Sequence, residues 1–197
     1  MISVLTAPLP CTIRADGQEL EVLTDFRDWI RFLLLIGSEL DAAEKASMLP
    51  LWLTEPRPLT AEIAEGLRGF CLARELEPDN PGNNADEEDE EAALQSRPPV
   101  WDWEVDGGFV LADFRRYYGI DLLHVNALHW WEFRALFSAL PPDSRSMERI
   151  GIRGMDLSKI RDKSQRKYYA ERQRRIALPF AVDDDVIGEL FANTMVR

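Results

Sequence analysis

The sequence predicts a mainly α fold, in which a helical domain with a small N-terminal β-hairpin is interrupted by a disordered acidic linker. Three observations predict it. Apolar residues recur at helical spacing through most of the chain. An Asp-Gly pair separates two short alternating runs near the N-terminus. Residues 76–99 are rich in acidic residues and contain no aromatic or β-branched residue, so they cannot bury enough apolar area to offset their ordering entropy.

The first element expected is a β-hairpin within residues 10–23. Thr12 and Ile13 lead into Asp16-Gly17, and the apolar positions alternate again over residues 20–23. Asp-Gly between two such runs is a strong hairpin signal, because both residues tolerate the positive φ of a tight turn.

Three helices are expected next, over residues 25–36, 41–50 and 60–75. Thr24 and Thr60 stand where N-caps are expected, and Gly37 is a natural stop for the first helix. The expected buried stripes recur at helical spacing and consist of Phe26, Trp29, Ile30, Leu33 and Ile36 in the first helix and Ile63, Leu67, Phe70 and Cys71 in the third.

The second half of the chain is expected to be helical throughout. The pattern predicts helices over residues 108–118, 122–140 and 144–152, then a turn and a basic helix within residues 155–177. We expect residues 100–179 to pack with residues 24–75 as one domain, residues 1–75 forming its N-terminal hairpin and helices. Residues 180–197 then form a tail with a short amphipathic helix.

The charge is unevenly spread. The net charge is −12, and residues 75–91 alone hold nine acidic residues and no basic one. Residues 143–175 instead hold eleven Lys and Arg against five Asp and Glu. The acidity opposes general nucleic-acid binding. Two cysteines without metal spacing, no basic signal sequence and no long apolar run lead us to expect a soluble intracellular protein that does not enter membranes.

The sequence offers no recognisable catalytic, metal or cofactor motif. It contains no phosphate-binding Gly-rich loop, no nucleophile elbow and no zinc-binding HExxH. His124 and His129 are the only histidines, and their spacing of five residues does not place both on one helix face. We therefore expect no catalytic residue, no metal and no cofactor, and a protein that is not an enzyme.

Two regions are candidates for partner binding. The run from Leu128 to Leu136 projects apolar residues around most of a helix, as expected for a core element, a partner-binding element or both. The candidates from this run and from the expected tail helix are Trp130, Trp131, Arg134, Phe137, Ile187, Leu190 and Phe191.

A basic face is expected on the helix after residue 155. Its candidate residues are Lys163, Arg166, Lys167, Arg174 and Arg175. Such a face is most often simply solvated. It could also bind an acidic protein segment, or nucleic acid, which the overall acidity makes the least favoured of the three.

Several stretches resemble one family in order and spacing over about residues 5–179. The chain resembles the bacteriophage gene product fifteen family of tail proteins from long-tailed phages and prophages. The run His-Trp-Trp-x-Phe-Arg-Ala-Leu is the most specific part. The matching stretches are residues 5–10, 24–30, 118–122, 128–136, 150–156 and 177–179.

The resemblance implies a tail assembly chaperone. Such a protein binds the tape measure protein while tail tube subunits assemble around it, with tube subunits and other copies of the chain as further candidate partners. It works in the host cytoplasm and is absent from the finished virion. The alternatives are a structural component of the tail or of the head–tail junction, and a nucleic-acid-binding accessory protein. The family supplies no catalytic residue, and the long acidic linker and the tail after residue 180 depart from its pattern.

Overall fold

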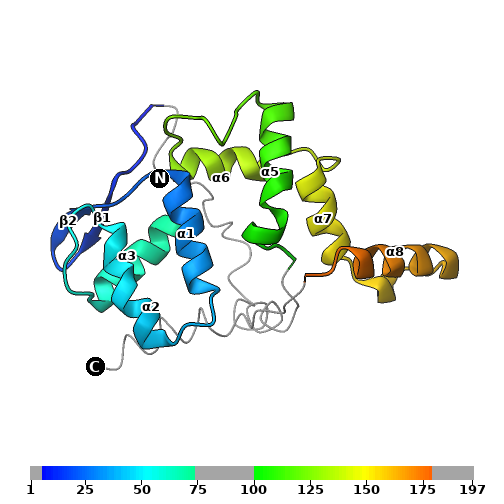
Figure 1. The fold of residues 1–197 in the computed structure, drawn as a ribbon, viewed down its shortest axis with the longest axis horizontal. Coiled ribbons are helices and arrows are strands. Elements are labelled where there is room, and N and C mark those ends of the chain that lie inside the picture. The colour runs from blue at the N-terminus through cyan, green and yellow to red at the C-terminus, as the bar shows by residue number, and fades with distance from the viewer. Residues whose placement is uncertain (1–5, 74–99, 179–197) are drawn as a thin grey trace. The chain divides into compact units, whose positions relative to one another are not determined.

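A computed structural model describes residues 6–73 and 100–178, and over these residues the chain is mainly helical, as predicted. The residues divide into two compact units, which are described separately (Figure 1). Of the described residues, unit 1 comprises 6–73 and 126–135, and unit 2 comprises 100–125 and 136–178. The acidic linker and the tail helix predicted for residues 180–197 lie outside the described residues. Packing of residues 100–179 with 24–75 as one domain stays a prediction.

The predicted hairpin is present at the start of unit 1. Strands β1 (Thr12–Ala15) and β2 (Gln18–Glu21) pair antiparallel, with Ala15 opposite Gln18. Asp16 and Gly17 between them have φ of 52° and 71°. Two successive positive φ angles are those of a type I′ turn, whose twist matches that of the flanking strands.

Three helices complete the N-terminal part of unit 1, as the sequence predicts. They are α1 (Phe26–Ile36), α2 (Ala42–Met48) and α3 (Ala61–Leu72), with a 3₁₀ turn at Leu49–Trp52. Each α-helix begins after a side chain that accepts a hydrogen bond from the first turn, namely Asp25, Asp41 and Thr60. These caps satisfy backbone donors that have no partner inside the helix.

Helix α3 packs against β1. Ile13 and Ala15 are buried on β1, and Gly66 of α3 lies so close that a Cβ atom there would be 2.9 Å from Cδ1 of Ile13. A glycine is therefore required at this position for the helix to approach the strand.

Unit 2 is built from α5 (Trp103–Tyr117), α7 (Arg145–Arg153) and α8 (Lys163–Arg175), with a 3₁₀ turn at Leu157–Lys159. Helix α5 packs on α7, and α8 follows α7 after the turn (Figure 1). The division between the two units falls within α6 (Trp130–Ser138), after Ala135.

Two helix starts differ from the prediction. Helix α5 begins at Trp103 instead of residue 108, because the Asp102 carboxylate caps it by accepting from the Val105 N–H at 2.7 Å. Helix α6 begins at Trp130 instead of residue 122, because the backbone just before it forms an isolated bridge with residue 25. Apolar spacing alone could not reveal that residues 25 and 129 pair across the chain.

Candidate functional site

Two stretches of the family resemblance, residues 24–30 and 128–136, meet in unit 1. The Trp130 N–H donates to the Thr24 carbonyl at 2.7 Å, and the Phe26 N–H donates to the Leu128 carbonyl at 2.9 Å. The starts of α1 and α6 are thereby joined through their backbones. The peptide groups that bond here are not held by either helix, so the bridge satisfies donors at both helix starts.

Asp25 fixes this junction. Its carboxylate accepts from the Arg27 N–H at 3.0 Å and from the Leu128 N–H at 3.4 Å. The Arg27 guanidinium also lies 3.0 Å from the carboxylate and stands over the Phe26 ring, 4.7 Å from its centroid. One side chain thus caps α1 and holds the segment that leads into α6.

His129 is a structural residue of the same junction. Its Nδ1 accepts from the Trp131 N–H at 3.1 Å, and its Nε2 lies 2.9 Å from the Pro10 carbonyl. Because Nδ1 accepts and Nε2 must donate, these contacts assign the neutral tautomer protonated at Nε2. Burial lowers the pKa of His129, although the Pro10 carbonyl and Glu132 oppose that effect.

The two predicted partner-binding tryptophans are core residues of unit 1. Trp130 and Trp131 are 2% and 3% exposed, and their indole N–H groups donate to the carbonyls of Cys71 and Phe70 at 2.8 and 2.9 Å. Ring stacking extends the cluster, with Phe26 on Phe133 at 4.9 Å between centroids. Both tryptophans are therefore core residues of unit 1, and their part in partner binding stays a prediction.

Arg134 and Phe137 are half-buried. The Arg134 guanidinium donates to the Cys71 carbonyl at 3.0 Å and so supports the C-terminal end of α3. Phe137 lies in unit 2, where its ring contacts Trp101 and Trp103. Ile187, Leu190 and Phe191 lie outside the described residues. Burial raises the pKa of the Cys71 thiol to about 12 in spite of the nearby Arg134, so this cysteine stays protonated.

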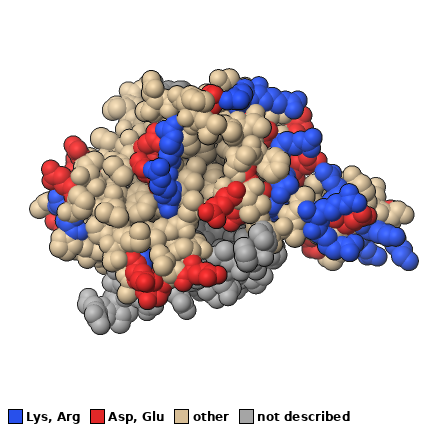
Figure 2. Space-filling model, in the orientation of Figure 1, with Lys and Arg blue, Asp and Glu red and all other residues tan. Residues whose placement is uncertain are grey.

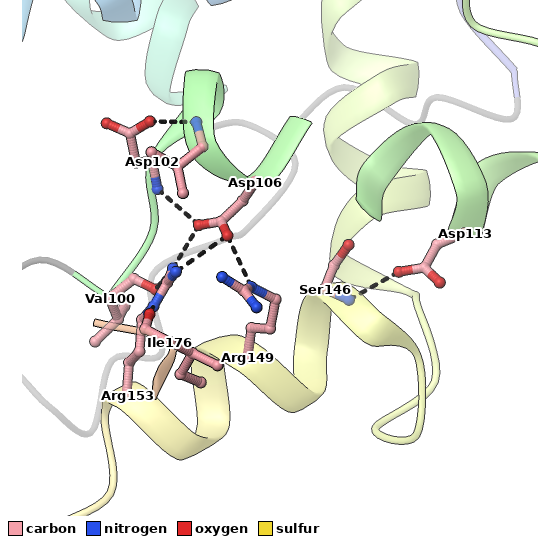
Figure 3. Close-up of polar contacts among 9 residues, drawn as sticks. Val100, Asp102, Asp106, Asp113, Ser146, Arg149, Arg153 and Ile176 are labelled. Carbon is pink, nitrogen blue, oxygen red and sulfur yellow. Dashed lines mark hydrogen bonds and ion pairs between the residues drawn. The ribbon is translucent and has the colours of Figure 1, made fainter. Parts of the chain in front are cut away.

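Unit 2 contains a buried charge network that the sequence did not suggest (Figure 3). Asp106 of α5 is 0% exposed, and its carboxylate is bound by Arg149 at 2.8 Å and by the Arg153 guanidinium, both on α7. Burial alone would raise the pKa of Asp106, but hydrogen bonds from Arg153, Arg149 and the Asp102 N–H outweigh it and hold the pKa below its ordinary value. The spacing of Arg149 and Arg153 on one helix face was the available signal.

Arg153 also connects the two ends of unit 2. Its guanidinium donates to the Val100 carbonyl at 3.1 Å and to the Ile176 carbonyl at 2.6 Å. A second buried carboxylate of α5, Asp113, accepts from the Ser146 N–H at 2.8 Å at the start of α7. Helices α5 and α7 are therefore joined by carboxylates at both ends of their contact (Figure 3).

Helix α8 presents the predicted basic face, and all five predicted residues are exposed. Figure 2 shows Lys and Arg gathered over this helix. Arg175 forms an ion pair with Glu171 at 2.5 Å. The other four share one face by helical spacing, and no ion pair joins them to an acid in the described part of the chain. We name these four the basic stripe: Lys163, Arg166, Lys167 and Arg174.

Other residues of α8 attach the helix to the rest of unit 2 through polar groups. Arg172 pairs with Glu148 of α7 at 2.7 Å, and the Gln173 amide donates to the carbonyls of Ile152 and Met155, each at 2.8 Å. No residue of α8 is buried. The helix is therefore attached through hydrogen bonds and an ion pair, and none of its side chains is fully buried.

The described residues contain neither a cluster that could hold a metal ion nor a helix that could span a membrane. Within residues 6–73 and 100–178, no group of three or more His, Cys, Asp or Glu side chains is placed to hold a metal ion. Over the same residues, no helix is long and apolar enough to cross a membrane.

A family model described as bacteriophage Gp15 protein matches residues 5–178. The chain belongs to this bacteriophage family. The match begins at the N-terminal segment and ends just after α8, so it includes the junction of α1 with α6, the Asp106 network and the basic stripe. Neither the curated proteins nor the solved structures contain a match to the chain.

Proposed function

We propose that this member of the Gp15 family is a tail assembly chaperone that binds the tape measure protein while tail tube subunits assemble. Membership in a bacteriophage family supports a role in the phage. Two of the stretches that resemble the family, residues 24–30 and 128–136, form the core junction of unit 1 and so build the fold. Other surfaces are left for a partner.

The observation that carries the binding part of this proposal is the exposure of α8. A helix of 13 residues that buries none of them gains little stability from its own chain. Its basic stripe has no acidic partner among the described residues, which suits a partner surface that carries acidic groups. A chaperone that must later release its partner is well served by such a polar contact, because salt and competing charges weaken it.

Co-expression with the tape measure protein of the same phage tests the proposal. We expect a soluble complex that co-elutes on size exclusion, and a tape measure protein that aggregates when expressed alone. A tape measure protein that stays equally insoluble, with no complex, would contradict the proposal.

A matched pair of variants tests the part played by α8. Lys163→Gln with Lys167→Gln removes two charges from the basic stripe, and Arg31→Gln with Arg116→Gln removes two exposed charges elsewhere. We expect the first pair to weaken the complex and to reduce its salt dependence, and the second pair to do neither.

The proposal also predicts that the protein leaves before the tail is complete. Mass spectrometry of purified virions should find no stoichiometric copies of this chain. Stoichiometric copies would support the alternative of a structural tail component.

The basic stripe also favours a second candidate function, binding of nucleic acid through its phosphates. The net charge of −12 opposes it. A gel shift at low salt with single-stranded and double-stranded DNA and RNA decides between the two. A shift that is lost in the Lys163→Gln, Lys167→Gln variant would favour the second candidate.

A further inference from the structure

The outer edge of strand β1 carries unpaired backbone groups. In an antiparallel pair, alternate residues bond across the ladder, and those between them point their N–H and C=O groups outward. The Val22 N–H donates to the Cys11 carbonyl at 2.9 Å, which continues the register of the hairpin and places Cys11, Ile13 and Ala15 in bonded positions. Thr12 and Arg14 therefore point their backbone groups outward. Among the described residues, nothing bonds to these groups.

The outer edge of β2 differs. Glu21, which lies opposite Thr12, accepts from the Thr54 N–H at 3.0 Å through its outward carbonyl. Val22 beyond it forms a bridge with Leu53. Residues 53 and 54 thus cover part of the edge of β2, whereas the edge of β1 has no such cover in the described part of the chain.

A groove of about 300 Å³ lies beside the open edge of β1. Pro10 and Arg14 line it from the strand side, Gly66, Gly69 and Phe70 from α3, and Trp131 from α6. Gly66 is needed for the approach of Ile13, but a Cβ atom at Gly69 would meet nothing within 4 Å. Gly69 therefore serves no close packing in unit 1, and its missing side chain leaves the groove open.

The groove and the edge together have the features of a strand-addition site. In such sites, backbone hydrogen bonds hold an extended segment and an adjacent pocket receives alternate side chains. Short strands with a charged residue also protect sheet edges from aggregation, and Arg14 is such a residue. An apolar groove next to the edge is not needed for protection, so it distinguishes β1 from a merely protected edge.

We propose that an extended segment of the tape measure protein adds to β1 as a third strand, an inference that rests on the proposed function. The segment bonds to the backbone of Thr12 and Arg14 and places an apolar side chain in the groove over Gly69. Arg14 is exposed, has no ion pair in the described residues and is the one charged residue that lines the groove. The segment therefore carries an acidic residue next to its apolar one, which pairs with Arg14.

Two proline variants test the backbone contact. Thr12→Pro removes an outward N–H from β1, and the matched control Glu19→Pro removes an outward N–H from β2. Neither change touches a hydrogen bond within the hairpin, so the two variants should unfold at similar temperatures. We expect Thr12→Pro to weaken the complex about tenfold or more and Glu19→Pro to leave it nearly unchanged.

Two leucine variants test the groove. Gly69→Leu fills it, and the control Gly108→Leu adds the same side chain on α5, where a Cβ atom also meets nothing within 4 Å. We expect Gly69→Leu to weaken the complex about as much as Thr12→Pro does, and Gly108→Leu to bind as the wild type does.

The assay is co-purification of the full-length chain with the co-expressed tape measure protein, followed by hydrogen exchange of backbone amides. The amides of Thr12 and Arg14 should exchange more slowly in the complex than in the free protein. If all four variants bind as the wild type does, the proposed binding site at β1 and the groove is wrong, and the chaperone function stands. If the wild type forms no complex, the proposed function fails and this occupant fails with it. Protection of the two amides that rises with the concentration of the chain alone would identify a second copy as the occupant and overturn the proposal.

Discussion

Each of the two units is stabilised internally by a different kind of contact. Unit 1 is built on stacked rings, including the fully buried Trp29 and Phe133, with the indole donors satisfied by backbone carbonyls. Unit 2 also has buried apolar residues, such as Phe114, but it adds a buried network of carboxylate and guanidinium groups with Asp106 at its centre. Within residues 6–73 and 100–178, five polar or charged residues are buried, and four of them lie in unit 2, namely Asp106, Asp113, Ser144 and Ser146.

The exception in unit 1 fits the comparison. Lys45 is 0% exposed, and its ammonium donates to the Ile36 carbonyl at 2.7 Å, at the C-terminal end of α1. Burial lowers the pKa of this lysine, and among the described residues it has no acidic partner. The Lys45 ammonium supplies a hydrogen-bond donor to the C-terminal end of α1 and belongs to no charge network in the described part of the chain. The difference between the units teaches that apolar burial should dominate the stability of unit 1, whereas ion pairing should control that of unit 2.

The largest effect should come from the aromatic core of unit 1. Phe133→Ala removes a fully buried ring that stacks on Phe26 and Trp130, and we expect a loss of about 3–5 kcal/mol in the free energy of unfolding. Urea unfolding measures the loss, and amide exchange should show it first in α1 and α3. A loss below about 1 kcal/mol would mean that apolar packing is not what holds unit 1.

The next effect should come from the charge centre of unit 2. Asp106→Asn leaves Arg149 and Arg153 without their counter-charge, and Arg153 has only 5% of its side chain exposed. We expect a loss of about 3 kcal/mol, with faster amide exchange in α5 and α7 than in unit 1.

The same variant should change the response to acid. Because the pKa of Asp106 is depressed in the folded protein, its contribution is fully present above the ordinary Asp value of about 3.9 and is lost as the pH falls through the folded pKa. The wild type should therefore lose unit 2 in this acid range, and Asp106→Asn should flatten that part of the curve. If unit 2 of the variant unfolds as steeply in acid as unit 2 of the wild type, the Asp106 ion pairs do not control the stability of unit 2.

A smaller effect should come from His129 in unit 1, in a different pH range. Its pKa is lowered in the folded protein, so below about pH 6.5 the unfolded chain takes up a proton more readily than the folded one does. Stability should therefore fall as the pH falls from about 6.5, by at most about 1.4 kcal/mol per pH unit. Urea unfolding at several pH values measures this. His129→Gln should remove the dependence, and His124→Gln, at a side chain 79% exposed, should keep it.

The smallest effect concerns the attachment of α8. Glu148→Gln removes the ion pair with Arg172, whose two side chains are 31% and 35% exposed. Such pairs contribute less than about 1 kcal/mol, so global unfolding should hardly change. Amide exchange within α8 should nevertheless speed up, and added salt should produce the same change in the wild type. Unchanged exchange in α8 would show that other contacts hold the helix.

Local signals in the sequence predicted most of the elements. The Asp16-Gly17 turn and the cap at Thr60 depend on neighbouring residues, and they appear where expected. The cap predicted at Thr24 was wrong, because Asp25 caps α1 and the Thr24 carbonyl instead accepts from the Trp130 N–H. The start of α6 was wrong because it depends on residues about 100 positions away, whose pairing leaves no periodic trace.

The candidate sites also divide into those that local spacing predicts and those that depend on distant contacts. The basic stripe could be predicted because helical spacing alone defines it. The apolar spacing of residues 128–136 also allowed a core role for Trp130 and Trp131, but it could not reveal their hydrogen bonds to carbonyls at the end of α3. The Asp106 network was missed because solvation is the default for a carboxylate, and only the packing of α5 on α7 overrides it.

The junction of residues 24–26 with residues 128–130 also has a consequence for the newborn chain. Asp25 and Leu128 are 103 residues apart, and a ribosome adds about 5–20 residues per second. For roughly 5 to 20 s, the aromatic side chains of α1 are therefore made but lack the helix that covers them. Until α6 emerges, the newborn chain exposes an apolar surface that the finished fold buries.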